Sequence, residues 1–300
     1  MTEFKKILCP TDFSEYSEYA MQYAAAFAQI SGASIDCVHV VDMGLGGEGV
    51  YASSADVQRS LDAVRAKAEK ELEHYVRKEH FLGLEIAPHL RTGHTATEIA
   101  AVGDEIGADL IIVATHGRSG LDRLVFGSVC DKLLRHSNVP VLAIKHPEHE
   151  ALGEDGSLSI DRILCPMDFS EFSHSTLPLA QELAKKFGAS ITLAHVVDVR
   201  FDYPEWTAQA AMNTSESLAK GAQEDLDRIA SEMVGIETDT FVATGAPHRE
   251  LADKIEADNI DLVILPTHGR KGLAHALLGS VTERIVRTSK CPVLTIRPSE

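Results

Sequence analysis

Two glycine-rich stretches of the sequence have the residue types and the spacing of an anion-binding loop. The first contains Ala114, Gly117, Arg118, Gly127 and Ser128, and the second has Pro266, Gly269, Arg270, Gly279 and Ser280 at the same places. An uncharged apolar run precedes each loop, as in a strand buried on both faces. Glycines let a ligand approach the main chain, and backbone amides at a helix N-terminus bind anions. The sequence therefore predicts two sites where an anion fits.

The end of each loop is typical of a helix start. Ser128 and Ser280 are each followed three residues later by a carboxylate, which is the spacing of a capping box, so we expect both serines to be N-caps. The alternative for each copy is a plain turn followed by an ordinary helix cap. Because the two copies share one spacing, a binding loop is favoured over that alternative.

These loops belong to a duplicated domain. The stretch Ile-Leu-Cys-Pro-Thr-Asp-Phe-Ser-Glu ending at Glu15 returns as Ile-Leu-Cys-Pro-Met-Asp-Phe-Ser-Glu ending at Glu171. His-Val-Val-Asp, which ends at Asp42, returns ending at Asp198. Self-similarity along the whole chain indicates a repeat. We expect one domain over residues 1–146, a polar linker over 147–159 and a second domain over 160–300.

Strand-like and helix-like periods alternate within each copy. In the first copy we expect strands near 5–10, 34–41, 85–91, 110–114 and 140–144, and helices from about 16, over 55–81 and 96–106, and from 129. The first helix of each copy carries an apolar stripe: Ala20, Tyr23, Ala24, Phe27 and Ile30, then Thr176, Ala180, Leu183, Ala184 and Phe187. This alternation predicts an α/β chain with two open parallel sheets covered on both faces.

Composition limits the partners. The 300 residues carry 28 basic and 45 acidic side chains, a formal charge of −17, which argues against a broad surface for nucleic acid or an anionic membrane. No signal peptide or membrane-spanning stretch is found, so a cytoplasmic location is expected. Five cysteines without a C-x-x-C pair suggest reduced thiols.

Two other features suggest chemistry only superficially. The run Gly44–Gly49 mimics a phosphate loop but lacks the following Lys-Ser/Thr, and Asp42 and Glu48 would repel phosphate, so a mobile loop is favoured. Four histidines, His39, His195, His116 and His268, invite a metal interpretation. No pair has zinc-like spacing, so we expect the first two to be hydrogen-bonded strand residues, the others loop residues, and no metal.

The motifs Ile-Leu-Cys-Pro-Thr-Asp-Phe-Ser-Glu, His-Val-Val-Asp, Thr-His-Gly-Arg-Ser-Gly and Phe-Gly-Ser-Val, in this order, resemble a universal stress protein domain, and the whole chain resembles tandem members of that family. The resemblance implies a Rossmann-like fold of the adenine nucleotide alpha hydrolase type, with strand order 3-2-1-4-5. The ends of strands 1 and 4 then meet at the topological switch point, where ligands bind.

The resemblance also implies nucleotide-binding residues. In ATP-binding members, the segment after strand 1 and the main chain after the strand 2 histidine hold adenine and ribose, and the glycine loop holds the phosphates. The residues implied in the first copy are Pro10, Thr11, Asp12, Val40, Gly117, Arg118, Gly127, Ser128 and Val129. Their counterparts in the second copy are Pro166, Asp168, Val196, Gly269, Arg270, Gly279, Ser280 and Val281. The ligand would be ATP or another adenine nucleotide, with or without Mg²⁺.

The chain departs from the family pattern at the first glycine of the loop. Ala114 and Pro266 stand there, and proline fixes φ and removes an amide, so we expect the first site to bind more tightly. The alternative for Asp12 and Asp168 is a cap or turn aspartate before the first helix. The apolar last strands, near 139–144 and 291–296, would be sheet edges that pair the two halves as a pseudo-dimer, and a homodimer is a further option.

Three functions remain open at this point. The first is a nucleotide-responsive stress protein that binds ATP or a related adenine nucleotide. The second is an interaction or scaffold protein with degenerate pockets, favoured by Ala114 and Pro266. The third is an enzyme that hydrolyses or transfers a nucleotide phosphate. The sequence supplies no matched nucleophile and base for that enzyme, so no catalytic residue is expected and at most slow ATP hydrolysis.

Overall fold

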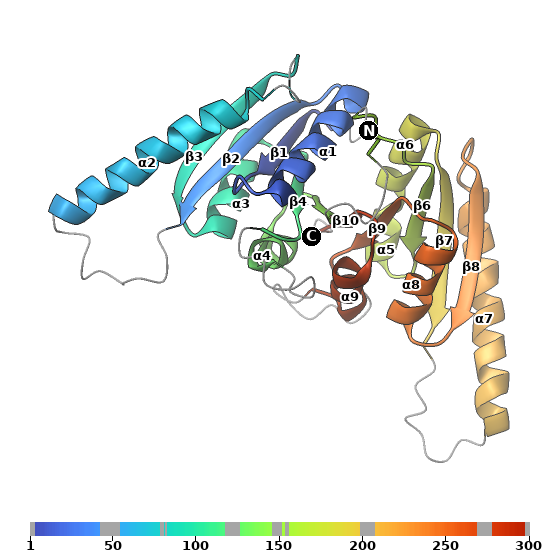
Figure 1. Ribbon diagram of the computed structural model, residues 1–300. Helices are drawn as coiled ribbons and strands as arrows, with labels where there is room; N and C mark the ends of the chain where they lie inside the picture. Colours follow the sequence, from blue (N-terminus) through green and yellow to red (C-terminus); the bar gives the residue numbers. More distant parts are fainter. Residues whose placement is uncertain are drawn as a thin grey trace. The chain divides into compact units, whose positions relative to one another are not determined.

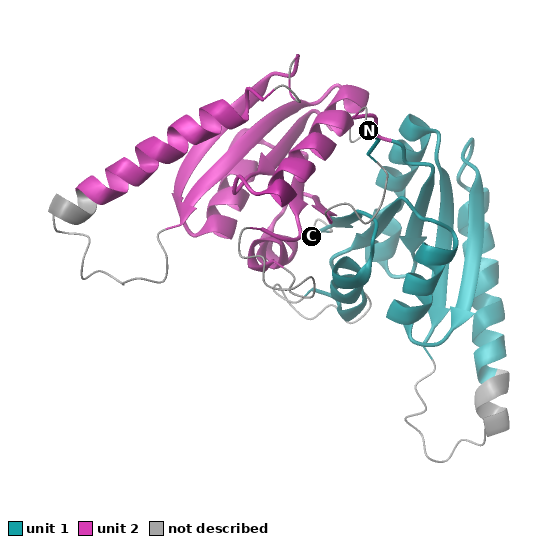
Figure 2. Cartoon of the chain, viewed as in Figure 1, with its two compact units in different colours: residues 1–2, 148–153, 159–300 teal, residues 3–147, 154–158 magenta. Residues whose placement is uncertain are grey.

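The chain folds into two compact units (Figure 2). The N-terminal unit, magenta in the figure, comprises residues 3–147 and 154–158, and the C-terminal unit comprises 1–2, 148–153 and 159–300. The computed structural model describes residues 4–42, 55–78, 81, 83–117, 127–145, 152–153, 156–198, 208–268 and 278–297. The expected glycine-run loop, its counterpart in the second copy and most of the linker lie outside these residues.

The N-terminal unit is built on a parallel sheet with the order β3-β2-β1-β4-β5 (Figure 1). Its strands are β1 (Lys6–Pro10), β2 (Ser34–Asp42), β3 (Ile86–Gly93), β4 (Leu110–Ala114) and β5 (Val141–Ile144). The central strand β1 pairs with β2 on one side and with β4 on the other. The direction in which successive strands are added to the sheet therefore reverses at β1, and the carboxyl ends of β1 and β4 lie side by side.

Helices cover this sheet on both faces. They are α1 (Glu15–Ser31), α2 (Ala55–Tyr75), α3 (Thr95–Ile106) and α4 (Ser128–His136). The hydroxyl of Tyr75, at the end of α2, donates to the Ser17 carbonyl of α1 over 3.3 Å. On the other face α3 packs against α4. Right-handed crossovers account for this division, because α1 and α2 lead to one edge of the sheet and α3 and α4 lead to the other.

The C-terminal unit repeats this plan. Its strands are β6 (Arg162–Pro166), β7 (Ser190–Val197), β8 (Thr238–Thr244), β9 (Leu262–Pro266) and β10 (Val293–Ile296), in the order β8-β7-β6-β9-β10. Its helices are α5 (Glu171–Ser175), α6 (Leu177–Phe187), α7 (Ala208–Ser231), α8 (Pro247–Ala257) and α9 (Ser280–Thr288). Both units thus have the strand order 3-2-1-4-5, which confirms the predicted fold. The pairing of the halves through their last strands stays a prediction.

Three local expectations were wrong. The first helix of the second copy is split at Thr176, because Pro178 has no amide to continue the hydrogen-bond ladder of α5. Ile30, the last member of the stripe in α1, is 37% exposed, since α1 ends one residue later at the left-handed Gly32. The long helix α2 ends at Tyr75 rather than near residue 81.

The thiols are as the sequence predicted. Cys9, Cys37, Cys130, Cys165 and Cys291 are all buried, and none of them forms a disulfide. Burial raises the pKa of Cys165 to about 12. None of the helices in the described part of the chain combines the length and the apolar composition that a membrane span needs.

Candidate nucleotide site

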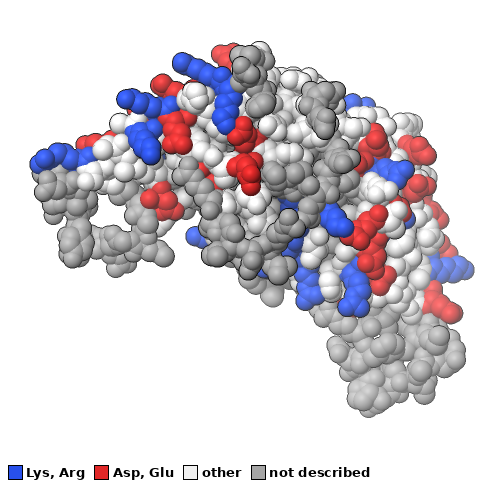
Figure 3. Space-filling model, viewed as in Figure 1, with Lys and Arg blue, Asp and Glu red and all other residues white. Residues whose placement is uncertain are grey.

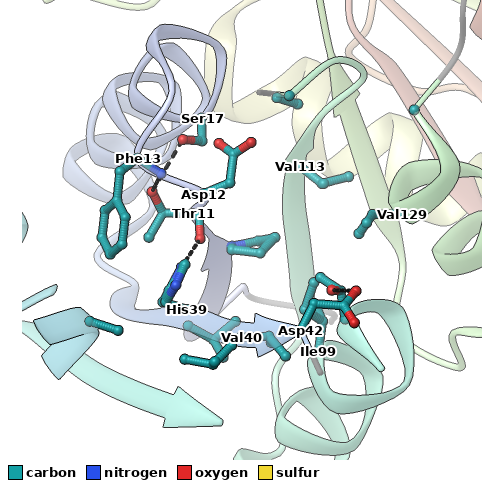
Figure 4. Close-up of a pocket in the computed structure, with 18 of the residues that line it drawn as sticks. Thr11, Asp12, Phe13, Ser17, His39, Val40, Asp42, Ile99, Val113 and Val129 are labelled. Carbon is teal, nitrogen blue, oxygen red and sulfur yellow. Dashed lines mark hydrogen bonds between the residues drawn. The ribbon is translucent and has the colours of Figure 1, made fainter. Parts of the chain in front are cut away.

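A cavity of about 590 Å³ opens where the carboxyl ends of β1, β2 and β4 meet in the N-terminal unit (Figure 4). Eight predicted site residues line it together: Pro10, Thr11, Asp12, Val40, Gly117, Gly127, Ser128 and Val129. Figure 4 shows Asp12 on the loop after β1 and His39 on β2, with Val113 and Val129 across the cavity. Arg118, the ninth predicted residue, lies outside the described residues. Segments far apart in the sequence therefore converge on one pocket.

The loop after β1 is held rigidly at the pocket. Its main chain continues the sheet, because the amide of Thr11 donates to the Val38 carbonyl over 2.9 Å. The buried Thr11 hydroxyl is 3.1 Å from the Ser17 hydroxyl and accepts from the Phe13 amide over 3.0 Å. Phe13 has a φ of 63°, an uncommon conformation for an aromatic residue. These bonds fix the direction in which the Asp12 side chain leaves the loop.

Asp12 has a structural partner on one oxygen. Its Oδ1 accepts from the amide of Ser14 over 3.1 Å and from the Ser14 hydroxyl over 2.5 Å. Ser14 itself is the N-cap of α1, so Asp12 is a turn residue and not the cap. Its Oδ2 faces the glycine loop, because a Cβ on Gly117 would lie 2.6 Å from that oxygen. Oδ1 therefore serves the turn, and Oδ2 lies on the side of the glycine loop.

His39 supports the same loop from β2. Its Nδ1 donates to the Thr11 carbonyl over 2.8 Å, since a carbonyl can only accept. The imidazole ring packs against the Phe13 ring, with 4.3 Å between their centroids. His195 makes the equivalent bond to the Met167 carbonyl over 2.7 Å. The two strand histidines are therefore hydrogen-bonded, as predicted, and they position the loop that carries the aspartate.

The glycine loop ends in a helix start that differs from the prediction by one residue. The N-cap of α4 is Gly127 and not Ser128, and no side chain caps the helix. The Gly127 carbonyl accepts the first helical bond, from the Asp131 amide over 3.0 Å. Gly127 has an extended conformation, with φ −61° and ψ 130°, so Ser128 is already the first helical residue. The predicted capping box is therefore wrong here, and equally at Gly279 before α9.

This correction matters for ligand binding. Because a glycine cap has no side chain, the first-turn amides of Ser128, Val129 and Cys130 receive no side-chain acceptor, and all three residues line the pocket. The N-terminal end of the helix dipole adds partial positive charge at the same place. A Cβ on Gly127 would lie 2.7 Å from the Thr115 carbonyl oxygen, so glycine is needed for packing as well. The arrangement suits an anionic group.

The C-terminal unit has the same framework in the described part of the chain. Asp168 Oδ1 accepts from the Ser170 amide over 3.0 Å and from its hydroxyl over 2.5 Å. Of the other predicted residues, Pro166 ends β6, Val196 lies in β7, Gly279 caps α9, and Ser280 and Val281 begin that helix. Gly269 and Arg270 lie outside the described residues. Met167 stands where the first unit has Thr11, so the hydroxyl that orders the first loop has no counterpart.

Several lining residues were missed by the sequence analysis. The helix α2 contributes Val64, Lys67, Ala68 and Glu71, and the start of α3 contributes Thr95 and Ile99. The Thr95 hydroxyl donates to Asp42 at the end of β2 over 2.9 Å. The order of elements implied by the family resemblance placed both helices near this edge of the sheet. It did not indicate which of their side chains reach the cavity.

Comparison with known proteins agrees with this architecture. The model of the universal stress protein family matches residues 3–145 and 159–297. The chain belongs to this family. A universal stress protein of Mycolicibacterium smegmatis is 26% identical over 300 residues, covering 97% of each chain. One from Methanocaldococcus jannaschii is 29% identical over 154 residues, or 47% of this chain and 95% of its own.

A solved structure extends the likeness to both units. The crystal structure of a universal stress protein from Archaeoglobus fulgidus matches with a TM-score of 0.68 and 22% identity, covering 99% of this chain and all of its own. At this identity the match speaks for the fold alone. The fold of both units therefore has a counterpart in one solved chain.

Proposed function

We propose that the N-terminal unit binds ATP or a related adenine nucleotide, and that the chain acts in the stress response as a nucleotide-responsive regulatory protein. One observation carries the proposal. Asp12, the main chain at Val40 and the uncapped start of α4 line a single cavity at the switch point between β1 and β4. Ligands of open α/β sheets bind at this point.

The pocket has two ends that suit the two parts of a nucleotide. Asp12 Oδ2 and the polar main chain beside Val40 offer acceptors and donors to a base and a ribose. The amides of Ser128 and Val129 offer donors to phosphate oxygens. Because β2 and β4 lie on either side of β1, Val40 is about 10 Å, or two strand spacings, from the end of β4, and Asp12, which follows β1, lies between them. A mononucleotide spans such a distance.

We propose binding rather than turnover. Cys130 is the thiol closest in sequence to the proposed phosphate amides and lines the pocket. Burial raises the pKa of this thiol far above its usual range, so it stays protonated and is a poor nucleophile. The hydrogen bonds from Ser14 to Asp12 Oδ1 fix this carboxylate in the turn, so it does not move as a general base would need to. At most, slow ATP hydrolysis is expected.

The second site is proposed as the weaker one. Asp168, Val196 and the start of α9 repeat the framework of the first site. Pro266, however, ends β9 without an amide, whereas Ala114 at the same place in β4 keeps one. The alternative of a scaffold protein with degenerate pockets applies more strongly to this unit than to the first.

The test begins with the purified full-length chain. Nucleotide released on denaturation is identified by mass spectrometry, and calorimetric titration then compares ATP, AMP and GTP on nucleotide-free protein. We expect an adenine nucleotide to co-purify, and ATP and AMP to bind more tightly than GTP. If no nucleotide co-purifies and none gives a binding isotherm, the scaffold alternative replaces this proposal. Multiple-turnover phosphate release separately tests for an enzyme.

A further inference from the structure

One wall of the N-terminal pocket comes from α2. Val64, Lys67, Ala68 and Glu71 line the cavity, and their spacing places them on one face of the helix. Ala68 is buried, whereas Val64 is 52% exposed. The wall therefore consists of a packed base and a rim of side chains at the cavity mouth.

The long helices of the two units can be aligned through their buried residues. Three buried apolar positions of α2 have the same spacing as three of α7: Ala68, Leu72 and Tyr75 against Ala222, Leu226 and Ile229. This alignment pairs Val64 with Leu218, which is 55% exposed, so the apolar rim residue is repeated. It pairs Lys67 with Gly221. The ammonium on the rim is thus present in the first unit and absent from the second.

No packing contact within the described residues requires a lysine at position 67 or a glycine at position 221. Lys67 is exposed and makes no ion pair or hydrogen bond with any other residue that the structure describes. A Cβ at Gly221 would meet nothing within 4 Å, so a larger side chain fits there. Figure 3 shows basic and acidic side chains interspersed over α2, as on an ordinary solvated helix. Lys67 differs from such surface lysines because it lines the cavity.

Lys67 also balances the charge of the pocket. Three carboxylates line the cavity, on Asp12, Asp42 and Glu71. Among the described lining residues, Lys67 alone is a lysine or arginine. Without its ammonium this wall would offer acceptors but no charged donor. A purine nucleoside presents ring nitrogens and ribose oxygens that need donors.

The topology places Lys67 at the nucleoside end. Helix α2 connects β2 to β3 and packs on these two strands, whereas α4 follows β4 on the opposite side of β1. The rim of α2 is therefore separated from the first-turn amides of α4 by the width of the central strands. An ammonium on α2 meets the base or ribose before it meets the phosphates.

We propose that Lys67 is a nucleoside-binding residue of this pocket, donating from its ammonium to an acceptor on the nucleoside. The inference rests on the proposed function, since it needs a nucleotide whose phosphates lie at α4. A role for Lys67 implies a second difference between the two units, separate from that in their glycine loops. Gly221 takes the place of Lys67 in the second unit and leaves that rim without a donor. The C-terminal site should hold the nucleoside less tightly for this reason as well.

The experiment measures AMP and ATP affinity by calorimetry on the full chain, comparing wild type, Lys67→Met and Lys70→Met. Methionine keeps the length of the side chain and removes the donor. Lys70 is an exposed lysine of α2 that does not line the cavity, so its variant is the matched control. We expect Lys67→Met to weaken AMP and ATP by the same factor, about tenfold, as for the loss of one charged hydrogen bond. Lys70→Met should bind like wild type.

Three results would overturn the inference. Unchanged affinity of Lys67→Met shows that the ammonium makes no contact. A loss that grows from AMP to ATP shows a long-range charge effect on the phosphates instead. An equal loss in Lys70→Met shows that any positive charge on α2 suffices. Failure of wild type to bind either nucleotide is distinct from these, because it refutes the proposed function and the inference falls with it.

Discussion

Replacing Asp12 by asparagine separates the two roles of this side chain. The amide oxygen of asparagine can still accept from the amide and hydroxyl of Ser14, as Asp12 Oδ1 does over 3.1 and 2.5 Å. The second oxygen, which faces Gly117, becomes an NH₂ group. An acceptor is thereby exchanged for a donor at the pocket, while the turn before α1 is kept. Asp12→Ala would remove both functions together and could not distinguish them.

Two opposing effects decide how much Asp12→Asn changes the affinity for a nucleotide. Loss of a hydrogen bond to a charged acceptor costs about 1.5–3 kcal/mol, which is about tenfold to a hundredfold in affinity. Removing the carboxylate also relieves its repulsion of the phosphates. Asp12 follows β1, one strand spacing from β4, and at about 5 Å this repulsion is about 0.8 kcal/mol per unit charge in a water-like dielectric, which salt reduces to about half. For AMP the lost hydrogen bond therefore wins, and binding should weaken.

The assay is calorimetric titration of AMP and ATP at physiological salt, with thermal unfolding measured on the same samples. We expect Asp12→Asn to bind about tenfold to a hundredfold more weakly and to unfold within about 2 °C of wild type, because the turn is preserved. Asp168→Asn, with the same turn bonds in the second unit, is the control and should change tight binding little. Wild-type affinity in Asp12→Asn would refute the reasoning and leave Asp12 with the turn role alone.

Three further predictions follow from the described residues. Ser128→Pro removes one pocket amide at the first helical position of α4, where proline fits after the extended Gly127. It should weaken nucleotide binding about tenfold without loss of stability, and Ser280→Pro should weaken it less. Equal losses of affinity in the two variants would contradict the ranking of the sites. Gly32→Ala should lower the free energy of unfolding by about 1 kcal/mol, because φ at Gly32 is +74°. Gly221→Ala lies within a helix and faces open space, so it should raise the free energy of unfolding by up to about 1 kcal/mol. Urea denaturation that showed both variants to be less stable than wild type would contradict these expectations. The five buried thiols should react with a thiol reagent only after unfolding, and rapid labelling of the native chain would refute this expectation. Burial raises the pKa of Cys165 to about 12, so this thiol ionises in the unfolded chain first, above about pH 8.5, and the free energy of unfolding should fall as the pH rises from there.

The sequence by itself determined the architecture and the part of the first pocket that lies at the strand ends. The duplication, the buried strands and the amphipathic first helix are visible in local spacing, because burial on one face imposes a period on the residues. The motifs after β1 and β4, together with the family resemblance, indicated residues of which eight now line one cavity. Local patterns suffice where a strand end and the loop that follows it supply the contacts themselves.

Only the tertiary structure decided how these residues are used. Gly127 took the cap position that Ser128 was expected to hold, because the loop amide of Gly127 bonds the Thr115 carbonyl and starts the helix one residue earlier. Asp12 proved to share its oxygens between a turn and the pocket. Lys67 reached the cavity because α2 packs on β2 and β3, a contact between segments that are distant along the chain. Such placements depend on how helices pack across the sheet, and the residue spacing within one helix does not contain that information.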